Sequence, residues 1–245
     1  MKNMTKHEAE EPIARTALFL VVAVAALILI NQYQIYEVNK LLNSKSSGTS
    51  FFKGFGSNDL SNVDLSESKS TAYSIALLYP LKDMQTVEDT IAVMLPSGTP
   101  EYGAELGVSY DDPVAALNLF SRKLYPQIKN DLKQNYPDVW QRYLSLATKP
   151  VGISCEYCCG VGPIGIESNG ELRCGCSHNP AIQAVVMWLM QNTDMTDAEV
   201  LREALVWKSL WFPKNMVGLG NQVATNGASG DLSALDQLGG MVGGC

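Results

Sequence analysis

The sequence predicts an α+β protein: a mainly helical soluble domain with a small β-hairpin Cys/His knuckle, preceded by one N-terminal transmembrane helix. Three observations predict this fold class. An uncharged apolar run lies near the N-terminus, apolar residues recur at helical spacing beyond residue 71, and five of the six cysteines fall within one short segment. A chain of 245 residues has room for one such domain beside a membrane anchor.

Composition divides the chain into five parts. They are an N-terminal tail (1–12), a transmembrane and juxtamembrane helix (13–42), a flexible linker (43–70), a soluble domain (71–213) with its Cys/His cluster at 155–178, and a glycine-rich C-terminal tail (214–245). The linker is assigned because Ser, Gly and Asn dominate it and apolar periodicity is missing. The tail is expected to be loose because glycine recurs throughout it.

The expected anchor centres on Thr16–Ile30, which reads TALFLVVAVAALILI and contains no charge. Ile13 and Ala14 extend this run toward the length that a bilayer needs. A cleaved signal peptide is the alternative, but Ala23-Val24-Ala25 is followed by further apolar residues, so we expect an uncleaved anchor. Three Lys or Arg residues precede the run and two follow it closely, which favours a cytoplasmic N-terminus and an extracytoplasmic soluble domain.

A heptad-like stripe follows the anchor and has two interpretations. Its residues are Ile28, Asn31, Ile35, Val38 and Leu42. A stripe with one polar Asn can fix the register of a helical homo-oligomer. The simpler interpretation, which we favour, is a single helix that continues out of the bilayer, because about two heptads are too few for a firm coiled-coil prediction.

The net charge of −7, with no concentration of Lys or Arg, argues against a nucleic-acid partner. Phosphate-binding loops, dinucleotide fingerprints and H-E-x-x-H zinc motifs are absent from the sequence. The two histidines are His7, in the N-terminal tail, and His178, so a catalytic triad could use only His178. These observations favour a binding or assembly role over an enzyme.

Local signals predict the elements of the soluble domain. Thr90–Leu95 reads TIAVML and resembles a short buried strand before a Pro-Ser-Gly turn. Asp112-Pro113 predicts a helix start, and Pro126 should kink or break that helix. A second helix should start at Tyr136-Pro137 and place Trp140 and Tyr143 in the core.

Two further helices are expected before the tail. Asn179 should cap, and Pro180 open, a helix that is apolar almost all round and should therefore be the buried centre of the fold. Thr196 and Glu199 form the pattern of a capping box, which predicts a helix running to about Trp211 and ended by Pro213.

The candidate functional site is the segment Cys155-Glu-Tyr-Cys158-Cys159-Gly, continued by Cys174-Gly-Cys176-Ser-His178. A C-x-x-C turn followed by Gly is typical of a metal-binding knuckle. Ser168-Asn169-Gly170 between the two halves predicts a hairpin turn. The second half lies at the start of the expected helix, whose dipole favours thiolate over thiol. Glu156, between the first two cysteines, is expected to be solvated.

The order of knuckle, hairpin, ligand pair and helix resembles a treble-clef zinc site. C-x-C-x-H replaces the usual second C-x-x-C, and six donors exceed the four of tetrahedral zinc. The resemblance implies as ligands Cys155, Cys158 and Cys176 with either Cys174 or His178, leaving Cys159 as a spare. Soft thiolates favour zinc, followed by Cu(I).

Two other uses of the cysteines stay open. All six could form a disulfide framework if the domain is exported, with Cys245 included. Alternatively, the cluster could be a redox site, either an iron–sulfur cluster or an exchanging dithiol.

The combination CEYCCG, CGCSHN and WKSLWFP also resembles a group of membrane-anchored, cysteine-rich prokaryotic proteins. It is more distantly similar to the PCYCGC-motif proteins, which are exported. The resemblance covers residues 107–213 and implies an exported metal-binding or redox domain, without naming a reaction. We therefore expect a membrane-tethered metal-binding module of the cell envelope; the alternatives are an electron-transfer protein and a disulfide-stapled structural domain.

Overall fold

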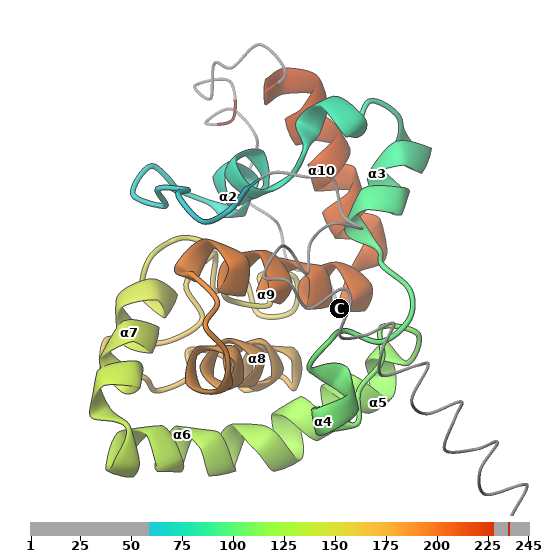
Figure 1. The fold of residues 1–245 in the computed structure, drawn as a ribbon. Coiled ribbons are helices and arrows are strands. Elements are labelled where there is room, and N and C mark those ends of the chain that lie inside the picture. The colour runs from blue at the N-terminus through green and yellow to red at the C-terminus, as the bar shows by residue number, and fades with distance from the viewer. Residues whose placement is uncertain (1–58, 228–234, 236–245) are drawn as a thin grey trace, which may run out of the picture. The chain divides into compact units, whose positions relative to one another are not determined.

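The computed structural model describes residues 59–227 and Leu235, and within them the fold is helical (Figure 1). The elements are α2 (Thr71–Leu78), the 3₁₀ turn η2 (Leu81–Asp83), α3 (Val87–Met94), α4 (Gly103–Leu106), α5 (Pro113–Asn118), the π-helical turn η3 (Leu119–Leu124), α6 (Tyr125–Asn135), α7 (Pro137–Ala147), α8 (His178–Asn192), α9 (Asp197–Trp211) and α10 (Pro213–Gly227).

The predicted α+β class and its β-hairpin are wrong, because the described residues contain no strand. Only two isolated bridges form, Ile153 with Ile164 and Ile166 with Leu172. The turn at Gly170 exists, with its N–H donating to Glu167 at 2.8 Å. Next to the second bridge, the Glu167 and Arg173 N–H groups donate to the Glu171 and Gly165 carbonyls, and this pairing is too short to form a strand. The Gly165 carbonyl also accepts from the Asn179 side chain of α8.

None of the helices in the described part of the chain has the length and apolar character that crossing a membrane requires. The expected transmembrane and juxtamembrane helix (13–42), with its heptad-like stripe, lies outside the described residues. The same holds for most of the expected linker and for nearly all of the C-terminal tail beyond Gly227.

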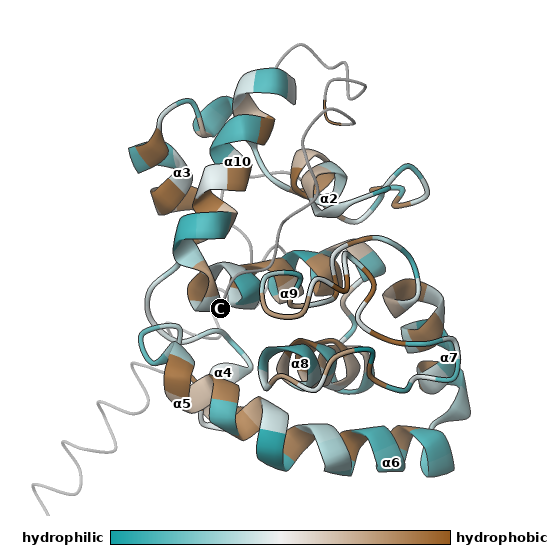
Figure 2. Ribbon diagram, turned by 180° about the vertical axis from the view of Figure 1, so that it is seen from behind, coloured by the Kyte–Doolittle hydropathy of each residue, from teal (hydrophilic) through white to brown (hydrophobic). Residues whose placement is uncertain are grey.

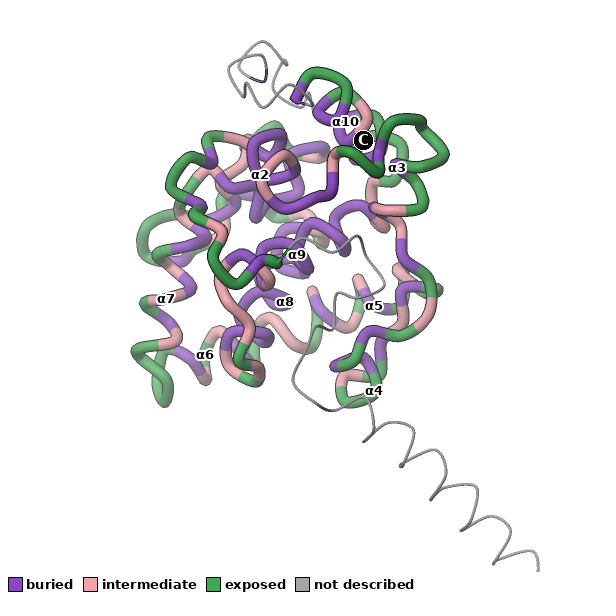
Figure 3. The backbone as a smooth tube through the Cα atoms, turned by 45° about the horizontal axis from the view of Figure 1, so that its top comes forward, coloured by how far each residue is buried: buried purple, intermediate pink, exposed green. Residues whose placement is uncertain are grey.

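Helix α8 forms the centre of the fold. It contacts η3, α6, α7 and α9, and the tube in Figure 3 shows it buried over most of its length. Val185, Val186 and Met187 have at most 1 % of their surface exposed. The predicted central helix is thereby confirmed, and so is the core position of Tyr143, which packs beside it from α7 and donates to Gln183.

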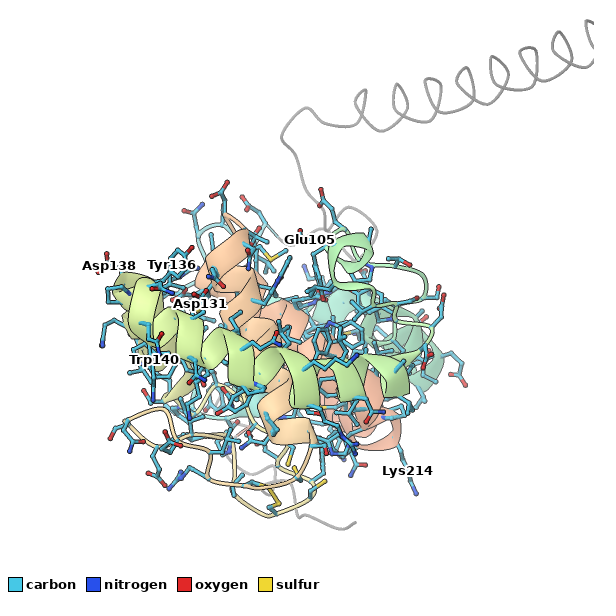
Figure 4. The ribbon with its side chains drawn as sticks, turned by 90° about the horizontal axis from the view of Figure 1, so that it is seen from below. Glu105, Asp131, Tyr136, Asp138, Trp140 and Lys214 are labelled. Atoms are coloured by element: carbon cyan, nitrogen blue, oxygen red, sulfur yellow. A yellow bond between two sulfur atoms is a disulfide. The ribbon has the colours of Figure 1, made fainter. Side chains whose placement is uncertain are left out.

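Helices α6 and α7 cover one side of α8 with an amphipathic face. The outward surface of α6 is largely hydrophilic in Figure 2, whereas Ile128 and Leu132 point into the core. Asp131, Tyr136 and Asp138 lie together near the α6–α7 junction in Figure 4. Tyr136 and Asp138 are exposed, whereas Asp131 is half-buried and accepts a hydrogen bond from Gln191 of α8.

Helix α9 packs on α8, and α10 contacts α9, α2 and α3 on the other side (Figure 1). The predicted capping box is present, since the Thr196 hydroxyl accepts from the Glu199 N–H and the Glu199 carboxylate accepts from the Thr196 N–H. The helix ends at Trp211, before Pro213, as expected.

Prolines set two helix starts and one irregularity. Asp112 caps α5, with Pro113 in the first position, and Pro137 opens α7, as predicted. Pro126 does not break its helix. The chain stays helical from Pro113 to Asn135, and the irregularity is the wider π-helical turn Leu119–Leu124 just before Pro126.

Two further expectations are corrected. Thr90–Leu95 is not a strand, because Thr86 and Asp89 form a capping box that starts α3 at Val87. The glycine-rich segment after Pro213 is not loose over its first part, because α10 runs to Gly227 and buries Met216, Leu219 and Val223. Apolar burial on α9 and α3 offsets the poor helix propensity of its glycines.

Candidate metal centre

All five described cysteines lie in the irregular loop 148–177 between α7 and α8, and His178 is the first residue of α8. The core holds this loop by buried polar contacts. The Gln183 side chain donates to the Ile153 carbonyl at 2.9 Å, and the Asn179 side chain donates to the Gly165 carbonyl at 2.8 Å. The two halves of the cysteine motif are thereby fixed against the same end of α8.

Asn179 does not have its predicted role as a cap. It lies within the first turn of α8, completely buried, and Ser177 occupies the N-cap position without a side-chain hydrogen bond. The Asn179 amide instead bridges two loop carbonyls, those of Gly165 and Cys174, and accepts from Gln183. Asn179 therefore connects the loop to the helix instead of starting the helix.

The cysteines are in two chemical states. Cys159 and Cys174 are joined by a disulfide, whereas Cys155, Cys158 and Cys176 take part in no disulfide. The Cys155 and Cys176 sulfurs lie 3.2 Å apart, and the Cys158 sulfur lies 3.6 Å from His178 Nδ1. The described cysteines therefore form one disulfide and not a complete disulfide framework. Cys245 lies outside the described residues.

The six predicted donors meet in two overlapping groups. One comprises Cys155, Cys159, Cys174 and Cys176; the other comprises Cys158, Cys176 and His178. Within each group, the donor atoms all lie within 4.8 Å of one another. The cluster is thus geometrically able to hold a metal ion, and the geometry does not specify which ion.

Two of the donor distances can be compared with those of tetrahedral zinc. With Zn–S bonds of about 2.3 Å and Zn–N bonds of about 2.0 Å, tetrahedral geometry puts two sulfurs about 3.8 Å apart and a sulfur and a nitrogen about 3.6 Å apart. The Cys158–His178 distance of 3.6 Å matches the second value. The Cys155–Cys176 separation of 3.2 Å is shorter than the first value, so an ion would move these sulfurs slightly apart.

The Cys155–Cys176 hydrogen bond polarises the pair. This hydrogen bond, and then burial, raises the pKa of Cys155 far above its ordinary value. The same bond lowers the pKa of Cys176 to about 4, against the effect of burial and with help from the His178 side chain. Backbone N–H groups of residues 178 and 179 add to this, in agreement with the expected effect of a helix N-terminus.

Glu156 is buried, and the expectation of a solvated side chain is wrong. Only 4 % of it is exposed, and its carboxylate accepts from Thr71 Oγ1 at 2.6 Å and pairs with Lys208 Nζ. Lys208 is fully buried and also donates to the Gly152 carbonyl. Burial lowers the pKa of Lys208, and the Glu156 charge opposes that effect. This ion pair attaches the Cys155–Cys158 turn to α9.

The same contact supports an unusual backbone conformation. Glu156 has φ +40°, and among the described residues it is the only one other than glycine with a positive φ. Such a conformation is unfavourable for a residue with a side chain and persists when surrounding contacts hold it. The Lys208 and Thr71 contacts supply this restraint, so they help to shape the turn that presents two of the thiols.

The end of α9 supplies the aromatic wall of the centre. The His178 ring lies 4.6 Å from the Phe212 ring and 6.1 Å from that of Trp211, measured between centroids. Tyr157, from the cysteine turn, also packs on Phe212, with 4.9 Å between the two ring centroids. These rings restrict the orientation of the His178 imidazole and cover that side of the site.

Sequence reasoning found the donors and missed the residues that position them. Lys208 and Phe212 belong to the WKSLWFP segment, which contributes to the resemblance but not to the predicted site. A lysine in the apolar run LVWKSLW was the available signal, since a charge on a buried helix needs a partner. For Asn179 and Gln183, one helical turn apart, no comparable signal exists.

The chain matches no protein-family model, no curated protein and no solved structure.

Proposed function

We propose that this domain is a metal-binding module of the cell envelope, which holds one zinc ion through Cys155, Cys158, Cys176 and His178. One observation carries the proposal. The Cys159–Cys174 disulfide removes two of the six donors, and the four that remain have the composition of a Cys₃His zinc site. Among these four, Cys176 is common to the group that contains Cys155 and to the group that contains Cys158 and His178.

The choice of zinc rests on donor chemistry. Three thiols and one imidazole, drawn from two parts of a loop and the first residue of a helix, are a common structural zinc set. The Phe212 ring packs against the His178 ring, and the adjacent residue, Asn179, is fixed by its hydrogen bond to the Gly165 carbonyl. With four protein donors the site has no open position, which favours a structural role over catalysis.

The role of the ion follows from the loop that it would hold. Thirty residues, 148–177, contain no helix or strand, and a loop of this length needs additional constraints to keep one conformation. Zinc would join its two cysteine turns to the start of α8. The loop surface then serves as a rigid binding or assembly face, and the proposed location outside the cytoplasm is compatible with the adjacent disulfide.

The test uses the full chain, purified in detergent without added metal or reductant. We expect about one zinc per chain by elemental analysis. Cys155, Cys158 and Cys176 should react with an alkylating reagent only after a chelator is added, as read by peptide mapping, which separates them from Cys245.

Matched variants identify the ligands. Cys176→Ser should lose the zinc, whereas the double variant Cys159→Ser/Cys174→Ser should keep it, because neither of these residues is a ligand in the proposed set. A wild-type chain without metal, in which the three thiols react equally with and without chelator, would overturn the proposal.

A further inference from the structure

The disulfide leaves the centre with more sulfur donors than one ion can use. The four sulfurs of Cys155, Cys159, Cys174 and Cys176 lie as close to one another as the members of a single metal site. Two of them are bonded to each other, and it is the thiolate form of cysteine that binds metals. The four-sulfur group is therefore complete only after the disulfide is reduced.

Cys176 belongs to both donor groups. A thiolate sulfur has three lone pairs, so one cysteine can bind two ions at once. With Cys176 shared, the reduced chain offers four thiolates to one ion. It offers Cys176, Cys158 and His178 to a second ion, at which one tetrahedral position stays open.

We propose that reduction of the Cys159–Cys174 disulfide converts the centre from a one-zinc site into a two-zinc site bridged by Cys176. The inference rests on the proposed function, which describes the oxidised state. In the reduced state, the second ion has two sulfurs, one imidazole nitrogen and a water. This is the donor pattern of zinc sites that accept an external ligand.

Charge balance supports the change. In the oxidised state, one Zn²⁺ and three thiolates give the centre a net charge of −1. Reduction adds two thiolates, which balance the charge of a second Zn²⁺, so the net charge stays at −1. This matters because Cys155 and Cys174 are buried, and an uncompensated charge there would be costly.

The exchange can start from solvent. Cys159 is exposed, whereas Cys174 is buried. A dithiol reductant attacks the Cys159 sulfur as a thiolate, the S–S bond breaks and Cys174 leaves as a thiolate. The second thiol of the reductant then releases Cys159, so the reductant becomes a disulfide and two electrons pass to the protein. Both new thiolates bind zinc, and their protons remain in solvent.

The experiment measures zinc per full-length chain in the two redox states. One sample is saturated with zinc without reductant. The other is treated with dithiothreitol, desalted without oxygen and then saturated with zinc. We expect about one ion in the first sample and about two in the second. With Co²⁺ in place of zinc, the thiolate-to-metal absorption per chain should also increase on reduction.

The control is Cys159→Ser/Cys174→Ser, which retains Cys245 and the Cys₃His set but lacks the redox pair. It should bind about one ion with and without reductant. A wild-type ratio that is the same in both states overturns this inference and leaves the proposed function standing. An oxidised chain that binds no zinc overturns the proposed function. In that case, the bridged site is supported only if the reduced chain binds two ions.

Discussion

Three charged side chains of α9 are almost completely buried: Arg202, Glu203 and Lys208. Each has partners in the fold. Arg202 donates to the Leu78 carbonyl and lies over the Tyr79 ring at 3.9 Å, and Lys208 pairs with Glu156. A buried charge without such a partner would cost several kcal/mol. These residues therefore specify how α9 packs, and Lys208 also connects that packing to the metal centre.

Glu203 provides a pH-dependent prediction that is separate from the metal. Burial raises its pKa above the ordinary 4.5, although the hydroxyls of Tyr102 and Tyr110 donate to its carboxylate and Arg202 lies nearby. The folded state therefore binds this proton more tightly than the unfolded state. The contribution of Glu203 to stability is complete below pH 4.5 and decreases as the pH rises from there toward the folded pKa.

Glu203→Gln should remove this pH dependence. As the pH rises through that window, the unfolding free energy of the wild type should fall relative to that of the variant, by up to about 1.4 kcal/mol for each pH unit. Urea denaturation of both proteins from about pH 5 to about pH 8 measures it. Arg202, Lys208 and the metal ligands are present in both proteins, so their titration cancels. Parallel pH profiles would contradict the prediction.

Helix α10 contains two glycines in different surroundings, Gly218 and Gly220. Its Gly220 faces α3, where a Cβ would overlap Met94 Sδ and approach Met84 Cε to 3.1 Å. Gly218 lies on the same helix, is exposed, and would place a Cβ in open space. It lines a pocket of about 340 Å³ between α3 and α10, with Val87, Ile91 and Lys214 among the other lining residues.

Alanine at these two positions should have opposite effects. Gly218→Ala should stabilise the protein by about 0.5–1 kcal/mol, because alanine is the better helix former. Gly220→Ala should destabilise it by about 1–2 kcal/mol, since overpacking against Met94 outweighs the same gain. Thermal unfolding of both variants measures the pair. Equal shifts of the same sign would mean that α10 does not pack on α3 through Gly220.

Local signals predicted most helix starts, and they did so where the interacting groups lie within one turn. Thr196 with Glu199 is the clearest case, followed by Asp112 with Pro113. The strand prediction for Thr90–Leu95 rested on the apolar run alone and left out a local signal of the same kind, the Thr86–Asp89 capping box just before it. The start of α10 also carried a local signal, Pro213, but its stability depends on burial against α9, α2 and α3.

At the scale of the whole molecule, the metal centre and the helical core should differ in their response to metal removal. The core around α8 consists of apolar contacts that do not involve the donors, whereas loop 148–177 depends on its cross-links. Chelation should lower the melting temperature, by about 2–8 °C for each kcal/mol lost, and leave most of the helical circular dichroism unchanged.

Limited trypsin digestion locates the change. Arg173 is exposed within the loop, and Arg122 is exposed on the helical turn η3. Chelation should accelerate cleavage after Arg173 and leave cleavage after Arg122 slow, because only the loop loses a restraint. Equal acceleration at both sites would mean that the metal holds the whole domain together.

The sequence by itself determined that six donors would meet, because they lie within 24 residues on either side of one turn. It also determined the central apolar helix and its capped neighbour, since those signals act within a few residues. Only the tertiary structure decided that Cys159 pairs with Cys174. It likewise decided that Glu156 is buried against Lys208, 52 residues away. Such pairings depend on which surfaces pack together, and the free energy that selects them is shared by the whole core.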